Sequence, residues 1–286
     1  MSRTWHSEEP ALDVSPGPAG WFRVLRRGVP IALVLSGGLA LMLLLRLGER
    51  PLFGLRRPVT PYVTVAVCRS VLWLMGLKWR CHGRTMKEGG ALVANHCSWI
   101  DICALNAADR ICFVAKAEVA GWPVIGWLAR ATGTVFIRRR RHEARAHNRV
   151  LEKRLKAGHR LLFFPEGTST DGLRVLPFKP TLFQAFLSPE LRRELWIQPV
   201  SVIYRAPAGE DPRFYGWWGD MEFGSHMLHV LAAQRQGRVD VVFHAPLQVR
   251  DFPDRKALAA ACEQAVRAGF AQYAPAVSGI PADSTV

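Results

Sequence analysis

The chain is poor in several features that point to common classes of protein. Only 23 acidic residues oppose 38 lysines and arginines, which gives a net charge of +15 over 286 residues. The six cysteines form no CxxC pair, so neither a disulfide scaffold nor a structural zinc site is expected. We expect reduced thiols in a cytosolic compartment instead. No GxSxG sequence occurs, which removes the support for a serine esterase.

The charge excess comes with a hydrophobic content of 49%. A chain that is both basic and apolar is typical of proteins that meet an anionic membrane surface or anionic substrates. Nucleic acid is the other common partner of basic proteins. The sequence has no zinc-finger spacing, recognition-helix pattern or RNP-like aromatic motif, so we expect no nucleic-acid partner.

Charged residues are absent from Gly28 to Leu45. A helix of about 18 residues is roughly 27 Å long, close to the ~30 Å hydrocarbon core of a bilayer. No small-residue cleavage site follows, so this segment predicts a retained anchor rather than a signal peptide. Arginines flank it on both sides and give no orientation.

A second apolar stretch, from Val59 to Leu77, carries Arg69 near its middle, which favours an interfacial or re-entrant helix over a clean span. The two stretches either include a spanning helix or form a hairpin that enters and leaves one leaflet. We therefore expect a basic arm at 1–27 and a membrane anchor at 28–77.

From Lys78 onward, short apolar runs alternate with longer amphipathic segments. The runs predict strands at 91–94, 111–115, 134–137, 160–164, 196–204 and 239–244. The segments predict helices at 99–107, 122–131, 143–157, 181–187 and 255–271. This alternation indicates an α/β fold with a largely parallel sheet and flanking helices over 78–272, a long ordered loop or lid at 205–224, and a flexible tail at 273–286.

His96 and Asp101 are the strongest candidates for chemistry. On one continuous helix their side chains would lie about 140° apart, because a turn holds roughly 3.6 residues. They can meet only if His96 lies in a turn after the strand at 91–94 and Asp101 in the first turn of the next helix. A carboxylate in that place fixes the tautomer of a histidine that acts as a base. A histidine that caps a turn beside a solvated aspartate has the same spacing.

Two further groups also follow predicted strands: Arg138 with Arg139, and Glu166, Gly167 and Thr168. In open α/β sheets the site lies at the carboxyl ends of the strands. We therefore expect these residues to converge with His96 on one cleft.

The segments that carry these residues come in a fixed order: NHCSWID at 95–101, GTVFIRR at 133–139, FPEGT at 164–168 and IQPV at 197–200. Together they resemble the four blocks of the glycerolipid acyltransferase family, which includes the 1-acylglycerol-3-phosphate acyltransferases, over about 78–204. The third block reads FPEGTSTDG and is similar to that of the lyso-ornithine lipid O-acyltransferases within the family. Members with arginine after the threonine differ from this chain, which has Ser169.

The resemblance implies catalytic roles for His96 as the base and Asp101 as its partner, with direct attack by the acceptor and no acyl-enzyme. It implies substrate binding by Arg139, with Arg138 where an acidic residue is common, and by Glu166, Gly167 and Thr168. Cys97 next to His96 invites a thiolate nucleophile, but neighbouring residues of an extended chain point to opposite faces. Ser98 is expected to cap the following helix, Lys179 to contact a headgroup, the donor or solvent, and Pro199 to shape a strand.

The sequence thus predicts a membrane-bound lysolipid O-acyltransferase without a metal or cofactor. Its donor would be an acyl carrier protein or coenzyme A thioester, both cytosolic, so the site would face the cytoplasm from the inner membrane. Its acceptor would be lyso-ornithine lipid, 1-acylglycerol-3-phosphate or both. An acyl-thioester hydrolase and a non-catalytic membrane-surface protein are the alternatives.

Overall fold

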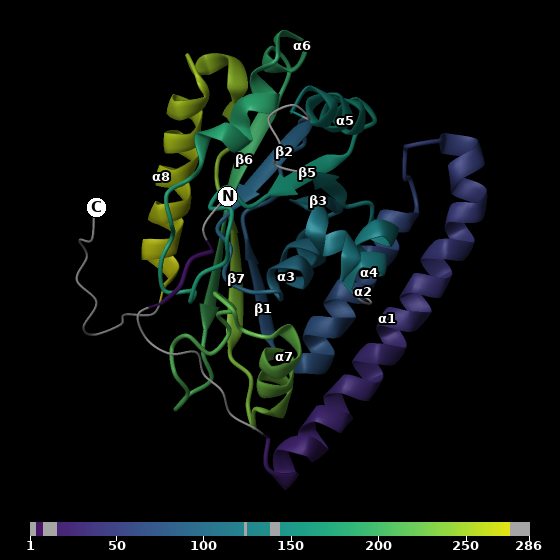
Figure 1. Ribbon diagram of the computed structural model, residues 1–286, viewed down its shortest axis with the longest axis vertical. Helices are drawn as coiled ribbons and strands as arrows, with labels where there is room; N and C mark the ends of the chain where they lie inside the picture. Colours follow the sequence, from purple (N-terminus) through teal and green to yellow (C-terminus); the bar gives the residue numbers. More distant parts are fainter. Residues whose placement is uncertain (1–3, 8–15, 123–124, 138–143, 275–286) are drawn as a thin grey trace.

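The computed structural model describes residues 4–7, 16–122, 125–137 and 144–274, and its centre is a mixed β-sheet between two layers of helices (Figure 1). The strands are β1 (Lys78–His82), β2 (Gly90–Ala94), β3 (Ile111–Lys116), β4 (Val135–Ile137), β5 (Arg160–Phe163), β6 (Trp196–Arg205), β7 (Arg238–Phe243) and β8 (Leu247–Gln248). Their order is β1-β7-β6-β2-β5-β3-β4, and β8 pairs with β6.

The neighbours from β6 to β4 in this order pair in parallel, whereas β7 runs antiparallel to β6, and β1 is parallel to β7. The largely parallel sheet that the sequence predicts is thus confirmed. All residues of the central strand β2 are buried, which explains why it reads as an unbroken apolar run. The carboxyl ends of β2 and β5 lie side by side and carry the motif residues that follow each strand.

The helices of the two layers have separate cores. On one face, α2 (Thr60–Met75), α3 (Asp101–Ala108) and α7 (Phe223–Ala232) share a core that includes Leu92 and Val202. On the other face, α5 (Ala144–Lys156), the 3₁₀ helix η3 (Pro180–Leu187) and α8 (Arg255–Tyr273) share a core that includes Val93. The short helices η1 (Ala117–Gly121), α4 (Ile125–Thr132), α6 (Pro189–Arg192) and η4 (Val249–Asp251) lie in the connections.

The structure differs from the predicted elements in several places, and the short elements η1, α6, β8 and η4 were not predicted. The segment 181–187 is a 3₁₀ helix rather than an α-helix. Strand β1 and helix α7 were not predicted, because β1 has mostly exposed residues and lies at the edge of the sheet, and α7 follows a stretch that reads as loop. The loop between β6 and α7 is present, and it buries Phe214, Tyr215 and Trp218.

The first helix, α1, runs from Pro18 to Phe53 over 36 residues. At 1.5 Å per residue it is about 54 Å long, well beyond the ~30 Å core of a bilayer. It begins at Pro18, so the division between a basic arm ending at residue 27 and an anchor starting at residue 28 falls inside one continuous helix. Figure 1 shows α1 along the outside of the molecule, with α2 between it and α3.

Contacts along its length attach α1 to the rest of the protein. Near its start, Arg23 and Arg27 donate hydrogen bonds to carbonyl oxygens at the end of α7, where the helix dipole favours a cation. In its middle, Gly38 lies so close to α2 that a Cβ atom there would stand 2.4 Å from Cγ2 of Val67. Past its end, Arg57 donates to the carbonyl of Ala131, at 2.7 Å. Helix α1 is therefore part of the folded unit over its whole length.

The outward side of α1 is apolar and exposed, with Leu33, Leu44, Leu47 and Leu52 each more than 60% exposed. Trp73 of α2 is also largely exposed, at 78%. Soluble monomers seldom expose apolar patches of this extent. By length and composition, α1 is also able to cross a membrane.

Candidate active site

The site begins where β2 ends. Asn95, the residue after β2, donates from its side-chain amide to the carbonyl of Val202 and accepts from the N–H of Val202, both at 2.8 Å. Its side chain thus continues the pairing of β2 with β6 beyond the last backbone rung, at Ala94 and Val200. This contact fixes the start of the turn that carries His96.

His96 and Asp101 meet as the sequence predicts. Asp101 is the first residue of α3, and its Oδ2 lies 2.6 Å from Nδ1 of His96. The imidazole is about one-fifth exposed, whereas the carboxylate is fully buried. Nδ1 therefore carries the proton that Asp101 accepts, and Nε2 makes no hydrogen bond to any described residue. A neutral histidine held this way can take a proton at Nε2.

Asp101 is held by neutral donors besides His96. Its Oδ2 accepts from the N–H groups of Cys97 and Ser98, at 3.0 and 3.1 Å, and its Oδ1 accepts from the hydroxyl of Tyr204, at 2.9 Å. Burial, and next the neighbouring Asp101, raise the pKa of Tyr204 well above its ordinary value, so this hydroxyl stays a donor. No arginine or lysine of the described residues pairs with Asp101, so its charge remains available to a protonated His96.

The neighbours of His96 in the turn are structural. Cys97 is buried, and its Sγ faces Oδ1 of Asp101 rather than the imidazole. Burial raises the pKa of the Cys97 thiol well above its ordinary value, and the carboxylates of Asp101 and Glu166 add to this, so the thiol is a poor nucleophile. The Ser98 hydroxyl accepts from the N–H of Ile100, but Ile100 is the N-cap residue of α3 and the helix has no side-chain cap, so the expected capping by Ser98 is wrong.

The segment after β5 covers His96 from the other side. The ring of Phe164 stacks on the imidazole with 4.0 Å between centroids and 12° between planes. Oε1 of Glu166 accepts the backbone N–H of His96 at 3.2 Å. Glu166 is 1% exposed, and burial raises its pKa well above the ordinary value against the opposing effect of that hydrogen bond. The side chain of Glu166 is thus buried beside the catalytic candidate.

Gly167 and Thr168 form the turn that follows. The φ angle of Gly167 is 75°, which only glycine adopts without strain, and its N–H donates to the carbonyl of Phe164. A turn of this kind can offer its backbone N–H groups to an anion. Here the N–H of Gly167 is used within the turn, whereas that of Thr168 has no partner among the described residues. Only Thr168 is left to supply such a donor from its backbone.

In the third block, this chain has Ser169 where other members have arginine, and the residues at 169–172 make contacts of their own. Thr170 donates its N–H to the carbonyl of His96, at 3.0 Å. Asp171 is buried, accepts the N–H of Leu173 and pairs with Arg174. This stretch therefore holds the His96 turn through Thr170 and holds the side chain of Arg174 through Asp171.

An apolar pocket of about 580 Å³ adjoins Glu166 and Thr168, and part of its wall comes from the N-terminus of the chain. The N–H of Trp5 donates to Oγ1 of Thr168 at 3.2 Å, and the Trp5 ring lies 6.3 Å from that of Trp218. The guanidinium of Arg174 lies 5.2 Å from the centre of the Trp5 ring. No local pattern indicates a role for Trp5, because its partners are more than 160 residues away.

The remaining predicted residues are placed as follows. Arg138 and Arg139 lie outside the described residues, directly after β4. Lys179 lines the pocket beside Pro177 and Phe178, and Pro199 lies within β6 opposite Val93. The described residues contain no group of His, Cys, Asp or Glu side chains arranged to hold a metal ion.

Residues 78–203 match the family model described as Acyltransferase. The chain is 58% identical over 268 residues to the lyso-ornithine lipid O-acyltransferase of Rhodobacter capsulatus, which covers 94% of this chain and 97% of that protein. It is 39% identical to the protein of the same name from Brucella abortus, over 70% of this chain and 78% of that one. The crystal structure of the 1-acyl-sn-glycerophosphate acyltransferase of Thermotoga maritima shares the fold, with a TM-score of 0.54 and 20% identity over 86% of this chain and 97% of that one.

Proposed function

The chain belongs to the acyltransferase family, and from this we propose that it is a membrane-bound lysolipid O-acyltransferase that completes a two-chain lipid. The acyl donor in this proposal is a thioester of acyl carrier protein or coenzyme A. The observation that carries the chemistry is the His96–Asp101 pair, in which Nδ1 lies 2.6 Å from Oδ2 of Asp101 and Nε2 makes no hydrogen bond to a described residue.

In the proposed reaction, the acceptor hydroxyl gives its proton to Nε2 of His96 as its oxygen attacks the thioester carbonyl. Asp101 stabilises the imidazolium that forms, and the tetrahedral intermediate collapses with loss of the thiolate, which takes the proton back from His96. General base catalysis of this kind contributes about 10²–10⁴ in rate. The buried thiol of Cys97 supports direct transfer without an acyl-enzyme.

Binding of the substrates is assigned to the residues around this pair. Glu166, as a buried acid, would contact the polar end of the acceptor, and the N–H of Thr168 would face an anionic group or the developing oxyanion. Arg139, with Arg138 beside it, would hold an anionic group of the acceptor or the carrier. The apolar pocket next to Glu166 suits an acyl chain.

Lyso-ornithine lipid is the acceptor we favour. The relatives from Rhodobacter capsulatus and Brucella abortus carry that name. In addition, the chain has Ser169 rather than arginine after Thr168, and the stretch from Ser169 to Gly172 contacts the His96 turn instead. The second candidate is 1-acylglycerol-3-phosphate, the acceptor named for the Thermotoga maritima structure.

Membrane attachment is assigned to α1 and α2. Because α1 is joined to α7 near its start and packs against α2 in its middle, we propose that the pair lies in one leaflet as a hairpin, with the exposed leucines of α1 in the acyl chains. This arrangement brings the domain to its lipid acceptor. Since both thioester donors are cytosolic, the leaflet would be the cytoplasmic one of the inner membrane.

The test uses the purified full chain in mixed micelles with labelled acyl carrier protein or coenzyme A thioester, offering lyso-ornithine lipid and 1-acylglycerol-3-phosphate side by side. We expect label in ornithine lipid. Label in phosphatidic acid alone would overturn the acceptor assignment. Release of free thiol at the same rate without either lysolipid would show a thioester hydrolase, and vesicle binding without any turnover would show a non-catalytic surface protein.

A further inference from the structure

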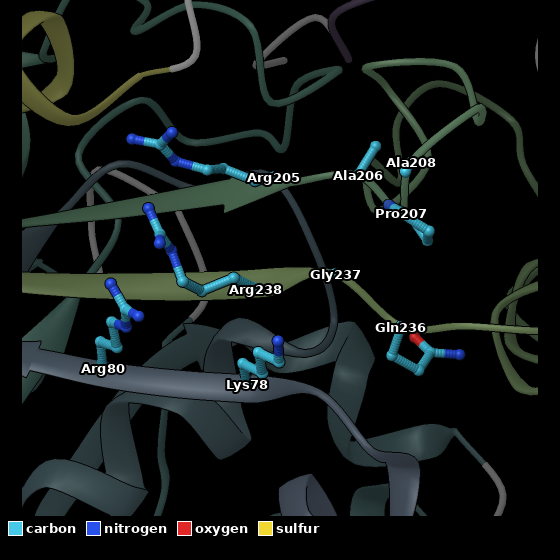
Figure 2. A pocket seen from close by; sticks show the side chains of 9 residues that line it. All are labelled: Lys78, Arg80, Arg205, Ala206, Pro207, Ala208, Gln236, Gly237 and Arg238. Carbon is cyan, nitrogen blue, oxygen red and sulfur yellow. The ribbon is translucent and has the colours of Figure 1, made fainter.

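A second group of charged residues lies on β1, β7 and β6, three neighbouring strands at one end of the sheet order. Lys78, Arg238 and Arg205 are directly opposite one another in the strand register, so three cations occupy one rung across three neighbouring strands. Arg80 lies two residues further along β1, on the same side of the sheet. Figure 2 shows these four side chains on three adjacent strands.

Like charges directly opposite one another destabilise a sheet. The carboxylate of Asp240 compensates part of the charge, because it accepts from Arg238 at 2.7 Å and lies 4.0 Å from Arg205. Lys78 and Arg80 form no ion pair with any described residue, and Nε of Arg205 is buried without an acceptor among them. Four cations against one carboxylate leave an excess of three positive charges at this edge.

The cations line a hollow of about 220 Å³, together with Pro207, Ala208 and Gln236. This space is large enough for a phosphate group and small for a folded partner. Arginine and lysine side chains that line one hollow suit a tetrahedral oxyanion, since the guanidinium donates two parallel hydrogen bonds.

The hollow opens on the face of the sheet that carries α8. Arg205 donates to the carbonyl of Tyr273 at the end of α8, at 2.7 Å. The intervening residue of β1, Trp79, points to the opposite face and donates to the carbonyl of Ala104 in α3. Since α2 packs on α3 and α1 on α2, the hollow lies across the sheet from the apolar surface of α1.

We propose that Lys78, Arg80, Arg205 and Arg238 form a binding site for a phosphate group, separate from the His96 site. The phosphate comes either from a soluble phosphate ester, such as the adenosine 3′-phosphate of a nucleotide-bearing thiol, or from a phospholipid headgroup. The assignment rests on the three-cation rung, on Lys78 and Arg80, which form no ion pair with a described residue, and on the hollow that these residues line.

The experiment titrates inorganic phosphate into the purified full chain in zwitterionic micelles at constant ionic strength and pH, with chloride as the reference, and follows heat of binding and unfolding temperature. We expect a saturable response in the wild type. The double variant Lys78→Gln/Arg80→Gln removes two cations without breaking a described contact and should bind phosphate at least about tenfold more weakly.

The matched control is Arg193→Gln/Lys256→Gln, which removes one arginine and one lysine that are also exposed. It should respond to phosphate like the wild type, and so should Lys78→Arg, which keeps the charge. A wild type without a saturable response, or a control that loses it as fully as the double variant, would overturn the site.

Two further arms identify the source of the phosphate. Displacement of inorganic phosphate by adenosine 3′,5′-bisphosphate, absent in the double variant, would support a soluble ester. Stronger recruitment of the wild type than of the double variant to phosphatidylglycerol vesicles, with equal binding to phosphatidylcholine vesicles, would support a headgroup. If neither probe distinguishes the proteins, the site holds an adventitious ion only and the proposal fails.

Discussion

Two histidine–aspartate pairs with buried carboxylates lie among the described residues, and their distances are nearly equal. Nδ1 of His96 lies 2.6 Å from Asp101, and Nε2 of His82 lies 2.8 Å from Asp240, with both carboxylates at most 1% exposed. The pairs differ in what else contacts the carboxylate. Asp101 receives neutral N–H and O–H donors, whereas Asp240 also pairs with Arg238. A histidine beside an aspartate is therefore not by itself a catalytic unit.

Position separates the pairs as well. His96 follows the carboxyl end of a central parallel strand, beside the segment that carries Glu166 and Thr168. His82 is the last residue of the edge strand β1, and its ring packs against Tyr273. Only the first place brings a free imidazole nitrogen to the edge of the sheet where open α/β folds bind their ligands.

The largest contrast is expected when each carboxylate is converted to an amide. Asp101→Asn should lower kcat by about 10²-fold or more, because an amide stabilises neither the required tautomer nor the imidazolium. Asp240→Asn should leave kcat within about twofold and instead lower the free energy of unfolding by ~1–3 kcal/mol, since Arg238 and Arg205 remain without their partner. Kinetics and chemical denaturation of both variants measure this, and a large loss of kcat in Asp240→Asn would contradict the distinction.

A third histidine, His226, is buried without a carboxylate. Burial, and next the neighbouring His229, lower its pKa from 6.5 to about 4, and its Nδ1 accepts from the indole of Trp99. Because the pKa is lower in the folded state, the unfolded chain binds the proton first. The contribution of His226 to the free energy of unfolding is therefore fully present above pH 6.5. It falls by up to about 3 kcal/mol as the pH decreases toward 4.

The measurement is the difference in unfolding free energy between wild type and His226→Gln as a function of pH. This difference in unfolding free energy should become smaller as the pH falls from 7 to 4. A difference that is independent of pH would show that His226 is not the group responsible.

Removal of the hydroxyl of Tyr204 tests how much the donors around Asp101 matter. Tyr204→Phe deletes one hydrogen bond of a kind that contributes ~0.5–1.5 kcal/mol, so kcat should fall by about two- to tenfold with an unchanged KM. Tyr215→Phe is the matched control, because it removes a buried hydroxyl that bonds Gln236 instead. Equal losses of kcat in both would mean that the effect is one of general stability.

The smallest expected effect concerns the pocket wall. Trp5→Ala removes an edge contact with Trp218 and a cation–π contact with Arg174, each worth about 0.5–1.5 kcal/mol. The KM for the lysolipid should rise by about three- to tenfold while kcat is retained. Trp127→Ala serves as the control, since Trp127 is exposed and lies outside the pocket. A fall in kcat with unchanged KM would place Trp5 in the chemistry rather than in binding.

What the sequence could predict follows from how local each feature is. The meeting of His96 with Asp101 depends on five residues and one strand-to-helix turn, and the buried strands β2 and β5 are continuous apolar runs, so both were predicted. Tyr204 joins Asp101 across 103 positions, and Trp5 joins Thr168 across 163. Strand β1 alternates charge with aromatic and thiol side chains at an exposed edge, so no apolar run indicates it.

The central claim is that His96, and not its geometric counterpart His82, is the base for acyl transfer. The most direct test measures transfer of labelled acyl groups from a thioester to lyso-ornithine lipid by the wild type, His96→Ala and His82→Ala at equal amounts of folded protein. The account predicts a loss of about 10²–10⁴-fold in His96→Ala and a rate within about twofold of wild type in His82→Ala. Comparable activity in the two variants would contradict it.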